Sequence, residues 1–326
     1  MIKKLGKWVA LGALVPVVAL AGIDAHQAGT VSGARTGLTI IAPASAGGGW
    51  DTVARELQAA MRENGVVSNP QVVNMPGAAG TIGLNQLMQM HGREDVVLVT
   101  GTTMVGGIEV NGLGQDLTET VPLRRLADDY MVLAVPASSP HQTLEEFVAA
   151  WQADPGALSI GGGSLGGTEH VLSGLMGQAA GIDPEDINYI SYSGGGEILT
   201  SMLSTSIDAG ISSYVEFGSQ IESGDMRALA ISAPEPVEGL EVPTFHEAGL
   251  EVDLINWRGV VAAPGVAGED LAELNAIIDE TVATDEWRNA LERNRWDSEE
   301  NTAEQFAAFI AEETTRIRSV IEEAGL

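Results

Sequence analysis

The sequence predicts an α/β fold of two domains. Its 326 residues are enough for two hydrophobic cores of ordinary size. From Leu38 onward, apolar runs of strand length alternate with segments that repeat apolar residues at helical spacing, which is typical of a largely parallel sheet. Two apolar strands closed by a proline, at 131–137 and 257–265, flank a compact βα segment. They indicate a chain that crosses into a second domain and returns.

We expect one domain to comprise residues 36–133 together with 258–326, and the other to comprise residues 134–257. The predicted strands are residues 38–44, 70–77, 95–101, 131–137, 158–163, 187–193, 207–212, 227–233 and 257–265. The predicted helices lie near or begin at residues 50–61, 80–90, 143, 168–176, 198–203, 214–221, 270–282, 285–294 and 302. Thr143 and Thr302 each precede a Glu or Gln by three residues, the capping-box pattern that opens a helix.

Residues 1–21 have the pattern of a cleavable signal peptide. Three lysines precede an apolar run from Trp8 to Leu20, and Ala19-Leu20-Ala21 gives the small-x-small cleavage pattern. The run is too short to span a membrane comfortably. The chain contains no cysteine, which excludes disulfides and lipid attachment through cysteine. We therefore expect export, cleavage near Ala21 and a mature protein that is free in the periplasm.

The charge of the chain is strongly negative. Asp and Glu number 45 against 16 Lys and Arg, and the formal net charge is −29. All three lysines lie in the leader, so cleavage would take the charge from −29 to −32. A surface of this sign repels nucleic acids and anionic membranes, and neither is an expected partner. A mature chain without lysine favours adaptation to high salt over solubility alone, because salt screens like charges.

A strand, three glycines and a helix follow one another three times, at Gly47–Gly49, Gly161–Gly163 and Gly194–Gly196. Glycine lets the backbone turn sharply and approach a ligand closely. The helix that follows offers unpaired N–H groups and the positive end of its dipole, which suit an anion. Such turns also serve packing alone. Three of them at the carboxyl ends of strands favour a binding site for an anion.

No cofactor or metal is predicted. Gly161-Gly-Gly163-Ser-Leu-Gly166 fits the dinucleotide pattern G-x-G-x-x-G, but the turn lies mid-chain and no acid ends a following strand where a ribose would need it. The five histidines are scattered along the chain, without the spacing of a zinc site.

A hydrolase is the enzymatic alternative. Gly162-Gly-Ser164-Leu-Gly166 fits the nucleophile elbow of α/β-hydrolases, with Ser164 as the nucleophile. That mechanism requires an acid and then a histidine later in the chain, and His246 is the only histidine after His170. His246 lies inside a Thr244–Glu247 capping box, where a solvated histidine is the plainer interpretation. We therefore expect no enzymatic activity.

Arg258 is a charged residue inside an apolar strand at the expected domain crossover. An arginine in such a place is usually paired, either with an acid of the protein or with a ligand carboxylate in bidentate fashion. Both pairings stay open from the sequence. Trp50 and Trp257 are candidate walls of a pocket, although tryptophans beside glycine turns are more often part of the core.

Together these segments resemble the substrate-binding component of tripartite tricarboxylate transporters. The resemblance covers the chain from about Leu38 to the terminal helix. It rests on the segments Ala42–Asp51 (APASAGGGWD), Asn74–Gly80 (NMPGAAG), Gly166–His170 (GGTEH), Tyr192–Glu197 (YSGGGE), Gly224–Ala230 (GDMRALA) and Val242–Gly249 (VPTFHEAG). Several motifs in the right order make it more specific than any one of them.

The resemblance implies a periplasmic-binding-protein (Venus flytrap) fold, with a hinge and a ligand cleft between the domains. It implies a small organic anion as ligand, held largely by backbone amides, and a transporter with small and large membrane subunits as partner; we expect a monomer. The candidate ligand-binding residues are Ser45, Ala46, Gly47, Gly48, Gly49, Trp50, Thr102, Thr103, Ser164, Gly167, Thr168, Ser193, Gly194, Gly195, Tyr214 and Arg258.

Trp257-Arg258-Gly259 resembles the subgroup associated with citrate-type ligands, which favours a tricarboxylate. Dicarboxylates and aromatic acids occur in the wider family. A binding protein that serves a sensor kinase instead of a transporter is a further alternative.

Stability is expected to rise with salt. The acid-rich mature chain repels itself, and chloride at molar concentration screens that repulsion. Melting temperature measured at increasing sodium chloride concentration checks this expectation. A melting temperature that does not change with salt would leave solubility as the only role of the acidic bias.

Overall fold

The computed structural model describes residues 33–112, 114 and 116–324, and the predicted leader lies outside them. Nine strands of the described chain form a mixed sheet in the order β2-β1-β3-β9-β4-β7-β5-β6, with β8 paired to β4. The strands are β1 (Leu38–Ala42), β2 (Pro70–Asn74), β3 (Val96–Gly101), β4 (Val121–Pro136), β5 (Ile160–Gly162), β6 (Tyr189–Ser191), β7 (Ala209–Ser213), β8 (Met226–Ile231) and β9 (Ile255–Ala262).

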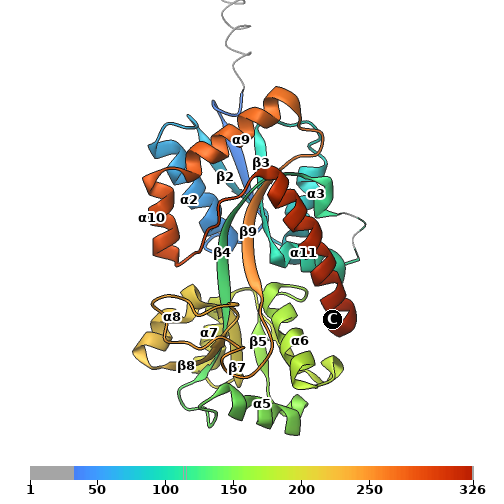
Figure 1. The fold of residues 1–326 in the computed structure, drawn as a ribbon, viewed down its shortest axis with the longest axis vertical. Coiled ribbons are helices and arrows are strands. Elements are labelled where there is room, and N and C mark those ends of the chain that lie inside the picture. The colour runs from blue at the N-terminus through green and yellow to red at the C-terminus, as the bar shows by residue number, and fades with distance from the viewer. Residues whose placement is uncertain (1–32, 113, 115, 325–326) are drawn as a thin grey trace, which may run out of the picture.

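Two long strands, β4 and β9, run between the two lobes of the molecule (Figure 1). The first half of β4 pairs antiparallel with β9, which in turn pairs with β3. The second half of β4 pairs antiparallel with β7 and β8. We call the part around β1, β2 and β3 the first lobe, and the part around β5, β6, β7 and β8 the second lobe. Each lobe has its own parallel strands, and the α/β fold predicted from the sequence is confirmed.

Ten α-helices of the described chain cover this sheet. They are α2 (Gly49–Glu63), α3 (Thr81–Met88), α4 (Thr102–Val110), α5 (Leu144–Ala153), α6 (Thr168–Ala180), α7 (Gly195–Leu203), α8 (Tyr214–Ser223), α9 (Gly268–Val282), α10 (Asp285–Asn294) and α11 (Ala303–Ala324). In the first lobe α2 and α10 lie to the left of the strands in Figure 1, and α3 and α11 lie to the right. Trp257, Trp287 and Phe306 are fully buried between these layers.

β4 begins ten residues before the strand predicted at 131–137. The prediction missed its first half because charged residues interrupt the apolar pattern there. Arg125 and Asp128 form an ion pair within that half, and the backbone of both residues still pairs with β9. Charges on a strand are compatible with burial when they pair with each other. The apolar pattern alone therefore found only the second half of β4.

Capping residues set the start of two helices as predicted. Thr143 Oγ1 accepts a hydrogen bond from Glu146 N at 3.2 Å, and Thr302 Oγ1 accepts one from Gln305 N at 3.3 Å. The Thr244–Glu247 segment makes both bonds of a capping box, at 3.0 and 3.1 Å, but it closes a turn and opens no helix. The two hydrogen bonds of a capping box can thus close an isolated turn as well as open a helix.

Replacing Gly106 with alanine is expected to destabilise the fold. A Cβ on Gly106 in α4 would collide with the carbonyl oxygen of Gly166, which lies in the second lobe before α6. Overpacking of this kind costs about 1–3 kcal/mol. Gly196→Ala is the matched control, since Gly196 also lies in a helix and has open space around its Cα; alanine there adds up to about 1 kcal/mol of stability. Urea unfolding of both variants measures the difference, and equal midpoints would contradict the prediction.

Candidate ligand-binding site

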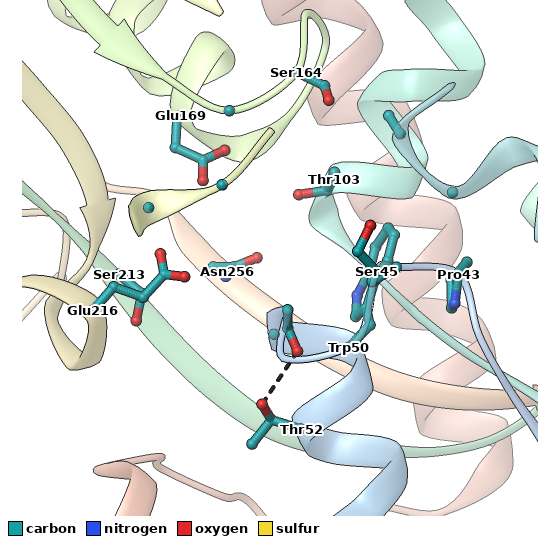
Figure 2. Close-up of a pocket in the computed structure, with 18 of the residues that line it drawn as sticks. Pro43, Ser45, Trp50, Thr52, Thr103, Ser164, Glu169, Ser213, Glu216 and Asn256 are labelled. Atoms are coloured by element: carbon teal, nitrogen blue, oxygen red, sulfur yellow. Dashed lines mark hydrogen bonds between the residues drawn. The ribbon is translucent and has the colours of Figure 1, made fainter. Parts of the chain in front are cut away.

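A cavity of about 530 Å³ lies between the two lobes, a volume in the ~300–1,000 Å³ range typical of small-molecule sites. Figure 2 shows residues of both lobes around it. The lining residues discussed below are Ser45, Gly47, Gly48, Gly49, Trp50, Gly77, Ala78, Ala79, Gly80, Thr103, Gly163, Ser164, Glu169, Ser193, Gly194, Gly195, Ser213, Glu216, Asn256, Arg258 and Trp296.

The turn between β1 and α2 is organised by a buried carboxylate, Asp51. Its Oδ2 accepts hydrogen bonds from Gly47 N at 2.7 Å and Arg55 Nε at 2.8 Å, and its Oδ1 accepts one from Asn74 at 2.8 Å. Gly47 has φ 85°, a left-handed conformation that glycine adopts without strain. No side chain caps α2 at Gly48, so the first-turn N–H groups stay available beside the cavity.

The other two glycine turns differ from each other. At 161–163 the glycines make room for packing, because a Cβ on Gly162 would collide with the Tyr189 hydroxyl and only Gly163 of this turn lines the cavity. At 194–196 the turn opens α7 at Gly194, and no side chain caps this helix start either. α4 likewise begins at a glycine without a side-chain cap, whereas the first N–H of α6 donates to Thr103 Oγ1 at 3.4 Å. Uncapped helix starts of this kind suit a carboxylate.

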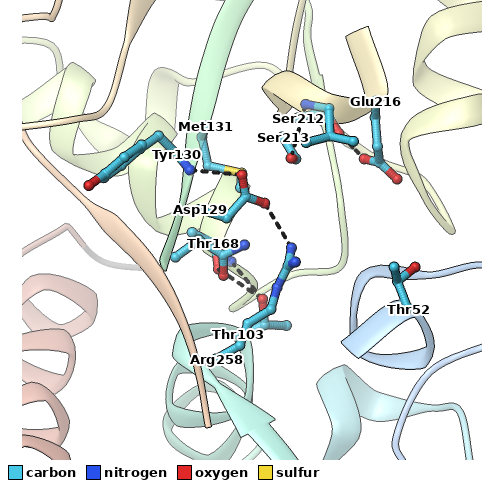
Figure 3. Close-up of polar contacts among 12 residues, drawn as sticks. Thr52, Thr103, Asp129, Tyr130, Met131, Thr168, Ser212, Ser213, Glu216 and Arg258 are labelled. Carbon is cyan, nitrogen blue, oxygen red and sulfur yellow. Dashed lines mark hydrogen bonds and ion pairs between the residues drawn. The ribbon is translucent and has the colours of Figure 1, made fainter. Parts of the chain in front are cut away.

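Arg258 lies in the cavity wall and is paired with Asp129 (Figure 3). Its Nη2 donates to Asp129 Oδ2 at 2.8 Å, and both side chains are at least 90% buried (8% and 3% exposed). Its guanidinium lies 5.2 Å from the ring centre of Trp296. A Cβ on Gly49 would come within 2.9 Å of Arg258 Nη2, so a glycine at 49 lets the guanidinium reach the β1–α2 turn. Asp129 is therefore one partner of Arg258. The guanidinium also lines the cavity, where a ligand can reach it.

Two glutamates of the second lobe, Glu169 and Glu216, point into the cavity from the side opposite Ser45 and Trp50 (Figure 2). Burial, followed by repulsion from Glu216, raises the pKa of the Glu169 carboxyl to about 7. Glu216 accepts a short hydrogen bond from Ser212 Oγ. Burial also lowers the pKa of the neighbouring His170 to about 4, and its neutral ring accepts a hydrogen bond from Gly166 N at 3.1 Å.

Most of the residues predicted for the site line the cavity. They are Ser45, Gly47, Gly48, Gly49, Trp50, Thr103, Ser164, Ser193, Gly194, Gly195 and Arg258. Five others have a different place in the structure and do not line it: Ala46, Thr102, Gly167, Thr168 and Tyr214. Whether any of them contacts a ligand stays a prediction.

Four of these five lie behind the wall or in the core, and Ala46 is exposed beside the β1–α2 turn. Thr102 Oγ1 donates to the Ile255 carbonyl at 2.9 Å and accepts from Trp257 N at 3.1 Å, which ties α4 to β9. Thr168 Oγ1 is 2.8 Å from Thr103 Oγ1 and 3.1 Å from Asn256 Oδ1, so it supports two residues of the wall (Figure 3). Tyr214 is buried in the hydrophobic cluster of the second lobe. Trp257 likewise belongs to the core, whereas Trp50 lines the cavity.

Sequence reasoning missed the loop before α3 and the acids of the cavity. Ala78 and Ala79 have φ 48° and 52°, and alanine rarely adopts this left-handed conformation. Backbone strain of this kind collects at functional sites. The Asn74–Gly80 motif includes this loop, but its residue types do not predict the positive φ of the two alanines. Glu169 and Glu216 looked like ordinary first-turn acids of α6 and α8, where helix starts favour them.

The nucleophile elbow predicted as an alternative is not assembled. Ser164 is exposed in the cavity, and no described side chain hydrogen-bonds its hydroxyl. His246 Nδ1 lies 3.0 Å from Glu251 Oε2 in a solvent-accessible turn, and His170 is occupied by Gly166 N. The described residues also contain no group of three or more His, Asp or Glu side chains that would hold a metal ion.

The model of the tripartite tricarboxylate transporter family receptor matches residues 53–326. The chain belongs to this family. Members of this family are substrate-binding receptors and not enzymes, so this chain is a periplasmic-type solute-binding receptor. Within the described residues, no helix combines the length and the apolar character that crossing a membrane requires.

Two relatives match about nine tenths or more of the chain. BugT of Bordetella pertussis is 27% identical over 315 residues, which cover 94% of this chain and 95% of that protein. A protein encoded in the tcbD-tcbE intergenic region of Pseudomonas sp. strain P51 is 26% identical over 300 residues, covering 89% of this chain and 86% of that protein.

Solved structures share the fold. MatC from Rhodopseudomonas palustris with bound malate superposes with a TM-score of 0.78 at 22% identity, covering 88% of this chain and 99% of MatC. A TctC solute-binding protein from Polaromonas has a TM-score of 0.69 at 27% identity, covering 88% and 98%. R. palustris Rpa4515 with adipate has a TM-score of 0.78 at 21% identity, covering 89% and 97%. The two-lobed periplasmic-binding-protein fold is therefore confirmed.

Glu169→Gln is expected to stabilise the protein increasingly as the pH rises from 4.5 to 7. Because the pKa of Glu169 rises from its ordinary 4.5 to about 7 on folding, the folded state holds the proton over this range. The stability contributed by the protonated carboxyl is complete below pH 4.5 and is lost as the pH passes 7. Glutamine stays neutral, so the variant gains about 1–3 kcal/mol over the parent at pH 8 and little at pH 4.5.

Urea unfolding of variant and parent at several pH values measures this gain. Glu197→Gln is the control, because Glu197 is an exposed first-turn acid of α7 that does not line the cavity. A gain that is the same at every pH would mean that Glu169 titrates like an exposed glutamate.

Proposed function

We propose that this receptor captures a small organic acid between its lobes and delivers it to a tripartite transporter. The observation that carries the proposal is the cavity between the lobes, which is bordered by uncapped helix starts from both sides. Backbone N–H groups at 49–50 and at 194–195 suit carboxylates without any lysine, a residue type that the sequence contains only in its first seven positions. The small and large membrane subunits of the transporter are the proposed partners of a monomeric receptor.

We propose further that residues 36–133 with 258–326 form one closing domain and residues 134–257 the other. Closure about β4 and β9 would bury the ligand and exclude water, which strengthens each amide contact in the lower dielectric. The course of both strands between the lobes supports a hinge at this place (Figure 1). Residues 1–21 are the proposed signal peptide, and the periplasm is the proposed location.

A tricarboxylate is the ligand that we propose for this site, and dicarboxylates are the nearest competitors. The basis is Arg258, a side-chain cation in the cavity wall with a planar donor fork that suits a carboxylate. Malate and adipate are bound by the similar R. palustris proteins, which keeps the wider class of small acids in view.

A thermal-shift screen tests the function. Citrate, isocitrate, tricarballylate, succinate, malate, adipate and terephthalate are added to the mature protein. A bound ligand at ~100 times its dissociation constant adds roughly 2.7 kcal/mol of stability. A shift with any of these acids supports capture of an organic acid. The absence of a shift with every one of them would contradict it.

Arg258→Ala is expected to weaken tricarboxylates more than dicarboxylates. Two backbone turns can each hold one carboxylate, and a third carboxylate then needs Arg258. Loss of a charge-assisted hydrogen bond costs about 1.5–3 kcal/mol, roughly ten- to a hundredfold in citrate affinity. Arg258→Lys should also be harmful, because a lysine lacks the planar fork. Calorimetric titration with citrate and with succinate measures both losses.

Arg318→Ala is the control for Arg258, since Arg318 pairs with Glu109 at a partly exposed site and does not line the cavity. Equal weakening of citrate and succinate by Arg258→Ala would assign Arg258 a general electrostatic role. No weakening of either acid would mean that Asp129 is its sole partner, and the tricarboxylate assignment would lose its side-chain support.

A further inference from the structure

The two walls of the cavity differ in hydrogen-bonding character. The first lobe presents donors, namely the first-turn N–H groups of α2 and the guanidinium of Arg258. The second lobe adds the carboxyl groups of Glu169 and Glu216, which both line the cavity (Figure 2). An ionised carboxylate only accepts hydrogen bonds. A plain dicarboxylate, itself an acceptor, has nothing to offer these two groups.

Local structure uses only part of the hydrogen-bonding capacity of the Glu169 carboxylate. Asp51 and Glu197 are also first-turn acids, and each accepts a hydrogen bond from the backbone of the preceding turn, from Gly47 N at 2.7 Å and from Ser193 N at 3.1 Å. The Glu169 carboxylate instead accepts a hydrogen bond from its own backbone N–H, and no described side chain donates to it or forms an ion pair with it. It lies over Gly163, where a Cβ would be 2.8 Å from its Oε2. An ionised carboxylate can accept several hydrogen bonds, so most of this capacity is left for a ligand in the cavity that Glu169 lines.

Charge balance leads to the same conclusion. The nearby cation, Arg258, is already bonded to Asp129 at 2.8 Å. Glu169 and Glu216 repel each other across the cavity, and Asp129 adds to that repulsion. A ligand that brings only negative charge next to this wall increases the repulsion, whereas a ligand with a donor group relieves it.

We propose that the acid captured here carries a hydroxyl or an ammonium group on its carbon chain, and that Glu169 and Glu216 accept its hydrogen bonds. This inference rests on the proposed function. One carboxylate of the ligand faces the N–H groups of the first lobe and another those at 194–195, while the donor group faces Glu169 and Glu216 of the second lobe. The two lobes thus recognise different parts of one molecule, and closure brings both into contact with it.

The pH dependence of binding distinguishes this arrangement from its rival, in which a protonated Glu169 donates to a ligand carboxylate. The charged or titratable groups around Glu169 are Glu216, Asp129, Arg258, Tyr189 and His170. A donor-bearing acid should bind better as the pH rises through 7 and Glu169 ionises. An acid held by protonated Glu169 should bind worse over the same range.

The experiment uses the mature protein and calorimetric titration at pH 8 with succinate, malate and aspartate, which differ only in H, OH and NH₃⁺ on one carbon. Tricarballylate and citrate form a second pair of the same kind. We expect malate, aspartate or both to bind at least tenfold more tightly than succinate, and citrate more tightly than tricarballylate. The preferred member of the trio identifies the donor as hydroxyl or ammonium.

The variants Glu169→Gln and Glu216→Gln keep an acceptor oxygen and remove the charge. An ammonium ligand should lose ten- to a hundredfold in affinity, a hydroxyl ligand only a few-fold, and succinate should be unchanged or improved. Glu145→Gln, at an exposed first-turn acid of α5 that does not line the cavity, should change none of them. Circular dichroism and unfolding midpoints check each fold, and either glutamate variant alone suffices if the other does not fold.

Succinate that binds as tightly as malate and aspartate would overturn the inference and leave the proposed function intact. So would variants that weaken all three acids equally, because they would assign the glutamates a structural role. Failure of the parent protein to bind any of the five acids would count against the proposed function itself.

Discussion

The buried ion pair between Arg258 and Asp129 joins the two strands on which the molecule depends. Arg258 lies on β9 and Asp129 on β4, at the level where these strands pass from one lobe to the other. Removing one partner of such a pair leaves an uncompensated buried charge, which costs about 3–5 kcal/mol. The pair also holds the guanidinium against Gly49, which places Arg258 beside the β1–α2 turn.

The same pair limits what the cavity can offer to an anion. Asp129 neutralises part of the positive charge that Arg258 presents to the cavity. The glycine turns at 47–49 and 194–196 are each followed by an acid in the first turn of the helix, Asp51 in α2 and Glu197 in α7. These acids stabilise two turns that line the cavity, because they bond the N–H of Gly47 and of Ser193. The overall field of a protein with a formal charge of −29 does not attract an anion, so the proposed ligand depends on a few oriented N–H groups.

Much of the fold could be predicted from the sequence because period and punctuation agree. Apolar runs ending in glycine or proline located the strands, and Thr143 and Thr302 located two helix starts through their capping bonds. The first half of β4 was missed because paired charges such as Arg125 and Asp128 hide a strand whose backbone is nevertheless fully engaged. Periodicity reports apolar burial, and it cannot report burial of polar groups that satisfy one another.

The candidate site was predictable only where the backbone makes it. The glycines at 47–49 and 194–195 can each be recognised within a short, continuous segment of sequence, and they line the cavity. Glu169, Glu216 and Asn256 come from three distant segments and meet there only in the folded chain (Figure 2). From the sequence alone, none of the three stands out as a ligand-binding residue. The two glutamates indicate a role in binding only because the cation described beside them, Arg258, is already paired with Asp129. The proposed selectivity therefore rests on residues that only the tertiary structure brings together.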